Sequence, residues 1–72
     1  MEKVFIRVRT KEGDIFISDQ NEMSEDEISQ LEKMIMKAVE GELKGFSFTK
    51  GKQKKFFGSE LLKTSVVSIY TV

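Results

Sequence analysis

The 72 residues carry twelve basic and twelve acidic side chains, so the net charge is zero, and 39% hydrophobic with 33% charged residues excludes a disordered tail. The absence of Cys and His excludes a disulfide and removes the preferred ligands of a structural zinc site. No apolar run approaches the roughly 18 residues of a membrane span, and the first ten residues lack the apolar core of a signal peptide. We therefore expect a single cytoplasmic domain over residues 1–72, without a cofactor.

The chain opens with a predicted hairpin. Residues 3–10 alternate apolar and polar side chains, as a half-buried strand does. Gly13 marks the turn into a second, shorter strand. A loop with an even number of residues sets Val8 opposite Ile17, whereas a three-residue loop sets Arg7 there. We predict the even loop and, with it, an apolar hairpin face made of Val4, Ile6, Val8, Ile15 and Ile17.

Residues 24–40 predict the only long helix. Ser24 followed by Glu27 forms a capping box, and Gly41 suits a left-handed helix stop. At about 100° per residue the apolar side chains fall on one arc: Met34, Ala38, Leu31, Ile35, Ile28 and Val39. The helix is therefore expected to pack that arc on a sheet.

Three further strands are predicted after the helix. Residues 45–57 form two strands around a lysine-rich turn, and their register stays open because Phe56 and Phe57 point to opposite faces. Residues 59–63 suit a single helical turn, and residues 64–72 are rich in the β-branched residues that favour strands. We predict an α+β fold of two layers, an antiparallel sheet (ββαββ plus a C-terminal strand) with one long helix on one face.

The residue content argues against an enzyme. The chain has no imidazole base and no thiolate, and no serine lies in a G-x-S-x-G motif. The stretch that begins at Asp19 starts like a calcium loop, but Met23, Ser24 and Gln30 occupy positions that need a ligand, a glycine and a bidentate glutamate. We therefore expect no catalytic, cofactor or metal site.

Two surfaces are candidates for binding. The first is an apolar patch expected on the sheet face opposite the helix, which would contact a partner protein or a second copy of the chain: Phe5, Phe16, Val66 and Tyr70. The second is a basic hairpin followed by two phenylalanines, a combination that suits single-stranded nucleic acid: Lys50, Lys52, Lys54 and Lys55. The alternative explanation of these lysines is that they only keep a small sheet soluble.

The closing stretch from Gly51, GKQKKFFGSELLKTSVVSIYTV, resembles small proteins of bacteriophages and prophages of Gram-positive bacteria. It shares with them a charged strand, a short Leu-Leu step and a final strand, and the rest of the chain shares only the outline of a hairpin, one helix and further strands. The resemblance implies an accessory role, frequently as a binding partner or inhibitor of a host protein, and it transfers no site residues. The leading hypothesis is therefore a non-enzymatic interaction protein that acts through an edge strand or the outer sheet face, and the alternative is a small nucleic-acid-binding protein.

Overall fold

The computed structural model describes all 72 residues and confirms the α+β class, with one main helix and a C-terminal strand. Six strands and two helices follow one another along the chain: β1 (Glu2–Arg9), β2 (Ile15–Ile17), β3 (Asn21–Met23), α1 (Glu25–Glu40), β4 (Gly45–Lys50), β5 (Gln53–Gly58), α2 (Ser59–Leu62) and β6 (Val66–Thr71).

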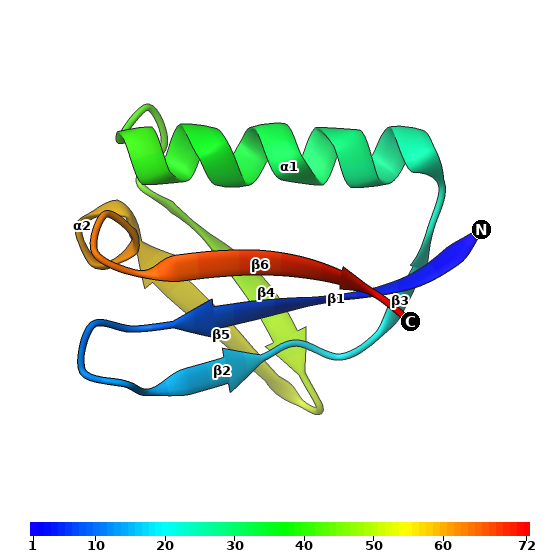
Figure 1. The fold of residues 1–72 in the computed structure, drawn as a ribbon, viewed down its shortest axis with the longest axis horizontal. Coiled ribbons are helices and arrows are strands. Elements are labelled where there is room, and N and C mark those ends of the chain that lie inside the picture. Colours follow the sequence, from blue (N-terminus) through cyan, green and yellow to red (C-terminus); the bar gives the residue numbers. More distant parts are fainter.

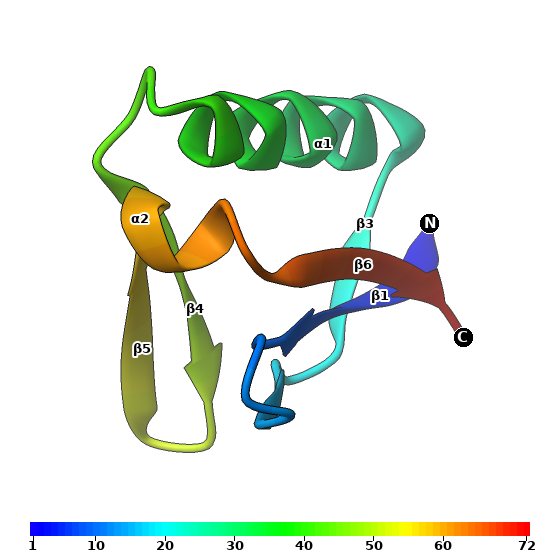
Figure 2. The same ribbon diagram turned by 60° about the vertical axis from the view of Figure 1, so that its left-hand side comes forward.

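The strands divide into two antiparallel sheets (Figure 1). In the four-stranded sheet, β1 is central: β6 pairs with one side of it, while β2 and β3 pair with successive parts of the other. The second sheet is the hairpin β4–β5, which passes behind β1 in Figure 1. Figure 2 shows this hairpin to the left of the first sheet, with its strands steeply inclined to β1. Helix α1 lies above both sheets in Figure 1, so the core is enclosed by α1, the four-stranded sheet and the β4–β5 hairpin.

Helix α1 begins and ends where its sequence predicts. The Ser24 hydroxyl accepts the Glu27 N–H at 3.3 Å, and the Glu27 carboxylate accepts the Ser24 N–H at 3.1 Å. Gly41 has φ 88° and closes the helix in the left-handed conformation. Ile35 and Ala38 are buried, as the apolar arc predicts. Met34, at the margin of that arc, is exposed beside Lys33 and Lys37, so its assignment to the core is wrong.

The register of the first hairpin differs from the prediction. Arg7 pairs with Ile17 and Val8 with Phe16, which is the arrangement that a three-residue loop produces. The Thr10 N–H donates to the Asp14 carbonyl at 2.8 Å, and the Gly13 N–H donates to the Thr10 carbonyl at 3.0 Å. The three residues between Thr10 and Asp14 end in Gly13 at φ 95°, a common hairpin loop in which glycine takes the left-handed position.

This register exchanges the two faces of β2. Phe16 points into the core, where its ring meets Phe57 edge-on at 5.6 Å between centroids. Ile15 and Ile17, expected in the core, are exposed on the opposite face. The odd loop shifts the pairing by one residue, and a shift of one residue turns every side chain of a strand to the other face.

The second hairpin supplies most of the aromatic core. Its register pairs Lys50 with Gln53 across a two-residue turn, and Gly51 opens that turn at φ 61°. The rings of Phe46, Phe48 and Phe57 point inwards, and all three are buried. Leu62, from the short helix α2, joins the same cluster. Phe56 is the phenylalanine of this hairpin that faces outwards.

Ser18 joins β2 to β3 along the edge of β1. Its N–H donates to the Ile6 carbonyl at 2.9 Å, and its hydroxyl accepts the Ile6 N–H at 2.8 Å, so one residue satisfies both backbone groups of Ile6. Ser18 is buried. Strand β3, which the sequence did not predict because Asn21 and Glu22 are polar, begins three residues later.

Replacing Ser18 with Ala is expected to lower the free energy of unfolding by about 1–3 kcal/mol, because the Ile6 N–H would lose its buried acceptor. Urea titration followed by circular dichroism measures the loss. Ser47→Ala is the matched control, since the half-buried Ser47 hydroxyl makes no hydrogen bond. Equal stability of the two variants would contradict a role for the Ser18 hydroxyl.

Candidate functional site

The face of the four-stranded sheet that turns away from the core carries the candidate site. Strand pairing places ten side chains there, which we call the outer face: Lys3, Phe5, Arg7 and Arg9 of β1, Ile15 and Ile17 of β2, Glu22 of β3, and Val66, Ser68 and Tyr70 of β6. Helix α1 and the β4–β5 hairpin pack on the opposite side of the sheet (Figure 1). No element of the chain covers the outer face.

An aromatic pair occupies one end of the outer face. Phe5 and Tyr70 lie opposite each other on β1 and β6, with ring centroids 5.0 Å apart and planes inclined by 16°. Arg7 reaches along the strand and donates from its guanidinium to the Tyr70 hydroxyl at 3.4 Å. Cross-strand aromatic pairs stabilise a sheet, so this end of the face is held in one arrangement.

The middle of the outer face is basic and apolar. Arg7 lies between Ile17 and Ser68, and Arg9 lies between Ile15 and Val66. The two ion pairs of the chain, Lys50 with Asp19 and Lys63 with Glu60, involve neither arginine. Val66 remains 63% exposed. The face therefore offers two guanidinium groups without carboxylate partners, each flanked by an aliphatic side chain.

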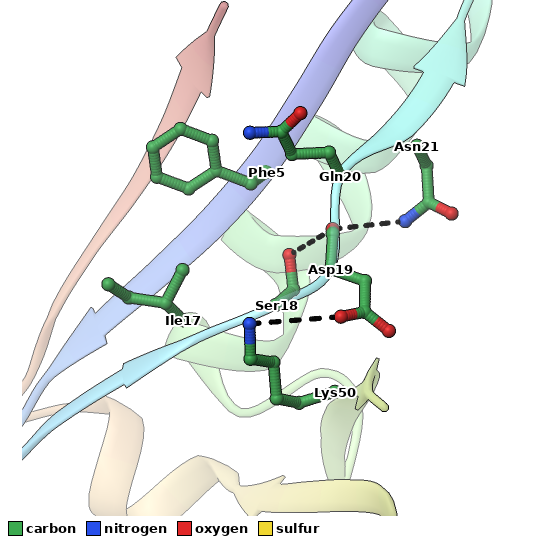
Figure 3. Close-up of a pocket in the computed structure, with 7 residues that line it drawn as sticks. All are labelled: Phe5, Ile17, Ser18, Asp19, Gln20, Asn21 and Lys50. Atoms are coloured by element: carbon green, nitrogen blue, oxygen red, sulfur yellow. Dashed lines mark hydrogen bonds and ion pairs between the residues drawn. The ribbon is translucent and has the colours of Figure 1, made fainter. Parts of the chain in front are cut away.

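A shallow hollow of about 700 Å³ adjoins the outer face where β2 gives way to β3 (Figure 3). Phe5 and Ile17 line the side that meets the outer face, and Figure 3 shows the Gln20 amide extending towards the Phe5 ring. Asp19 and Lys50 form an ion pair of 3.8 Å at the other side. The hollow thus offers amide, carboxylate and ammonium groups beside an apolar wall.

The Asp19 side chain and backbone fix the β4–β5 hairpin beside this hollow. Its carboxylate accepts the Gly51 N–H at 2.8 Å, and its own N–H donates to the Thr49 carbonyl at 2.9 Å. These bonds join the connector between β2 and β3 to the tip of the second sheet. The hollow is therefore built from both sheets.

Three of the four residues predicted for the apolar patch lie on one face of the sheet, with Val66 opposite Arg9 and four residues along β6 from Tyr70. Phe5, Val66 and Tyr70 are on the outer face, with Phe5 against Tyr70. Phe16 is not: the three-residue loop at Gly13 turns it into the core, so its inclusion in the patch is wrong. Ile15 and Ile17 take its place, and the sequence signal that indicates them is the glycine three residues after Thr10, which favours the odd loop.

The predicted lysine surface is divided between two faces. Lys50 pairs with Asp19, and the Lys55 ammonium lies 4.8 Å from the centroid of the Phe16 ring. Lys52 and Lys54 are exposed, and Phe56, on the same face of β5 as Lys54, is 65% exposed. The hairpin therefore presents one lysine beside one aromatic ring, together with a lysine in the turn.

Comparison of the chain with protein-family models, curated proteins and solved structures gave no match. No helix of the structure has the length and apolar character that crossing a membrane requires. No three acidic side chains converge closely enough to hold a metal ion.

Proposed function

We propose that this chain is a non-enzymatic interaction module that binds a partner protein through its outer face. The observation that carries the proposal is the uncovered combination of the Phe5–Tyr70 stack, exposed Ile15, Ile17 and Val66, and two arginines without carboxylate partners. Exposed apolar side chains gathered in one patch mark contact surfaces. Aromatic residues and arginines are the residue types that contribute most to such surfaces.

The charges of the outer face define the chemistry of the partner. Lys3, Arg7 and Arg9 run along the central strand, and the acid that pairs with this row, Glu22, lies opposite Lys3 at its end. Carboxylates of the partner would satisfy the guanidinium groups in bidentate fashion. We therefore propose a partner surface that places acidic side chains between apolar ones, and the resemblance to small phage proteins directs the search to a host protein of a bacterium.

Affinity capture from a bacterial lysate tests the proposal. The amount of partner captured by the double variant Arg7→Glu/Arg9→Glu is expected to fall about tenfold or more, because charges that were complementary become repulsive. Lys33→Glu/Lys37→Glu makes the same change of charge on the exposed side of α1 and should retain the partner. Quantitative mass spectrometry of the two eluates measures the difference, and circular dichroism verifies that both variants fold.

Two results would contradict the proposal. The first is capture that disappears when the lysate is treated with nuclease and that depends on Lys52 and Lys54, which would assign the chain to nucleic acid. The second is a solution mass of two chains that Phe5→Ser reduces to one, which would make the outer face a homodimer interface.

A further inference from the structure

The strand β6 has an open edge. It pairs with β1 on one side only. The Val72 N–H donates to the Lys3 carbonyl, and Ile6 directs its N–H and carbonyl to Ser18 on the other side of β1. In an antiparallel ladder, the backbone groups of successive residues point alternately to the two sides of the strand. Since Val72 bonds to β1, the even-numbered residues of β6 bond to β1 as well. The backbone groups of Val67 and Ile69 therefore point to the open edge.

The strand itself has none of the sequence features that usually protect an edge against further pairing. Natural edge strands carry lysine, proline, an inward charge or a bulge. The sequence of β6, VVSIYT, contains no charged residue and no proline, and its pairing with β1 runs without interruption from Val66 to Thr71. A six-residue edge of this kind is a template for another strand.

An apolar groove runs between the β6 edge and α1. It consists of two hollows of about 350 and about 360 Å³ that share three lining residues, Ile35, Met36 and Val67. Ile69 extends the groove at one end and Val39 at the other. Met36 is 60% exposed although it lies among these apolar side chains. Figure 1 shows α1 running alongside β6 over the whole length of the strand.

Two glutamates of α1 mark the ends of the groove. Glu32 lines one hollow and Glu40 the other, and neither takes part in an ion pair. Eight helical residues separate them by about 12 Å along the axis. Side chains four residues apart on a β-strand are separated by about 13 Å. A strand lying in the groove would therefore bring its first and fifth side chains to the two glutamates.

We propose that the β6 edge and α1 bind an extended segment of a partner protein with the pattern basic-x-apolar-x-basic, by addition of a strand to β6. The backbone of the segment pairs with Val67 and Ile69, its apolar side chain enters the groove at Met36, and its basic side chains reach Glu32 and Glu40. This site goes beyond the proposed function, because it uses the edge of the sheet and not the outer face. Main-chain pairing with alternate side chains in pockets is a general mode of peptide recognition.

The charges disfavour a second copy of the chain as the occupant. Pairing of β6 with β6 of a copy about a two-fold axis would place both α1 helices on the same side of the joined sheet. Glu32 and Glu40 of one helix would then approach the same acids of the other, and like charges at an interface disfavour association. A basic segment meets no such repulsion.

Selection from a random heptapeptide display library tests the site. We expect enriched peptides with basic residues four positions apart and an apolar residue midway between them. The enriched peptide, synthesised with a fluorescent label, should bind Met36→Lys about tenfold or more weakly than the unmodified chain, because an apolar contact is replaced by a charge. Met34→Lys is the matched control, since Met34 is on the same helix but outside the groove, and it should bind normally.

A second measurement tests the pairing of the backbones. N-methylation of the peptide amides that face β6 should abolish binding, whereas methylation of the alternate amides should preserve it, because only one set of amides bonds to an antiparallel or parallel neighbour. The Arg7→Glu/Arg9→Glu variant should bind the peptide normally. A failure of the proposal for the β6 edge can therefore be distinguished from a failure of the proposal for the outer face.

Three results would overturn the proposal: no enriched pattern, equal binding by Met36→Lys and Met34→Lys, or indifference to the position of the N-methyl groups. A chain that is dimeric in solution and becomes monomeric on Met36→Lys would overturn it as well, because a second copy would then occupy the edge.

Discussion

Replacing Leu62 with Ala is expected to lower the free energy of unfolding by about 2–5 kcal/mol. Leu62 is 0% exposed and is the largest side chain that the fold buries completely. It enters the core from α2, a helix of only four residues that has no side-chain cap, so the leucine itself holds α2 in place. At about 0.05–0.15 kcal/mol per residue, a domain of this size has a total stability of about 4–11 kcal/mol. The substitution should therefore remove a large share of the total stability and clearly lower the midpoint of thermal unfolding.

Leu61→Ala provides the matched control for Leu62. Leu61 is the neighbouring residue of the same short helix and is 38% exposed. Its truncation should therefore lower the free energy of unfolding distinctly less than that of Leu62. Thermal unfolding followed by circular dichroism compares the two variants. Similar midpoints for Leu61→Ala and Leu62→Ala would contradict the burial of Leu62 in the core.

Replacing Gly45 with Ala is expected to destabilise the protein by about 2–6 kcal/mol, from backbone strain and overpacking together. Gly45 has φ 155°, which side-chain-bearing residues rarely adopt. A Cβ at this position would clash with the Phe57 carbonyl and would lie 2.9 Å from the Phe56 ring. The carbonyl belongs to the paired strand β5, so it cannot move without breaking the hairpin.

Gly58 offers the control for this substitution. It pairs directly with Gly45 across the hairpin. The nearest atom to a Cβ at Gly58 is the Lys44 carbonyl oxygen, at 4.0 Å, and its backbone is extended at φ −73°. Gly58→Ala should therefore unfold at nearly the same urea concentration as the unmodified chain. A Gly45→Ala variant of equal stability would show that the hairpin can shift to admit the methyl group.

Local sequence signals predicted the helix well. The capping box, the apolar arc and Gly41 all act within a few residues of one another, so no knowledge of the rest of the chain is needed to interpret them. The α+β class follows from the same helix set among strands. The buried Leu62 could not be distinguished from Leu61, because a single helical turn has no periodicity from which to choose a face.

The outer face was predicted only in part because it depends on the register of one loop. Parity favoured an even loop, since that loop sets Ile17 opposite Val8 and not opposite Arg7. The preference of glycine for the last position of a three-residue loop is local, and it decided the register at Gly13. Phe16, Ile15 and Ile17 all changed faces as a consequence.

The division into two sheets and the groove between β6 and α1 could not be predicted from the sequence, for a different reason. The steep crossing of the β4–β5 hairpin depends on contacts such as that between Phe16 and Phe57, which are 41 positions apart. No local pattern specifies where α1 lies relative to β6. The acids at Glu32 and Glu40 look like ordinary solvated charges until the structure places a strand edge beside them.

The central position of β1 has a consequence for how the chain acquires its structure during synthesis. β1 is synthesised before the other five strands of this sequence and β6 after them, and the hydrogen bond between Arg7 and Tyr70 spans 63 residues. The hairpin of β1 with β2 can form early because its contacts are local. The part of β1 that holds Val4, Ile6 and Val8 stays unpaired on its other side until β6, its longest partner strand, has been synthesised. Such distant pairing slows folding, so the four-stranded sheet can be completed only after β6 has been synthesised.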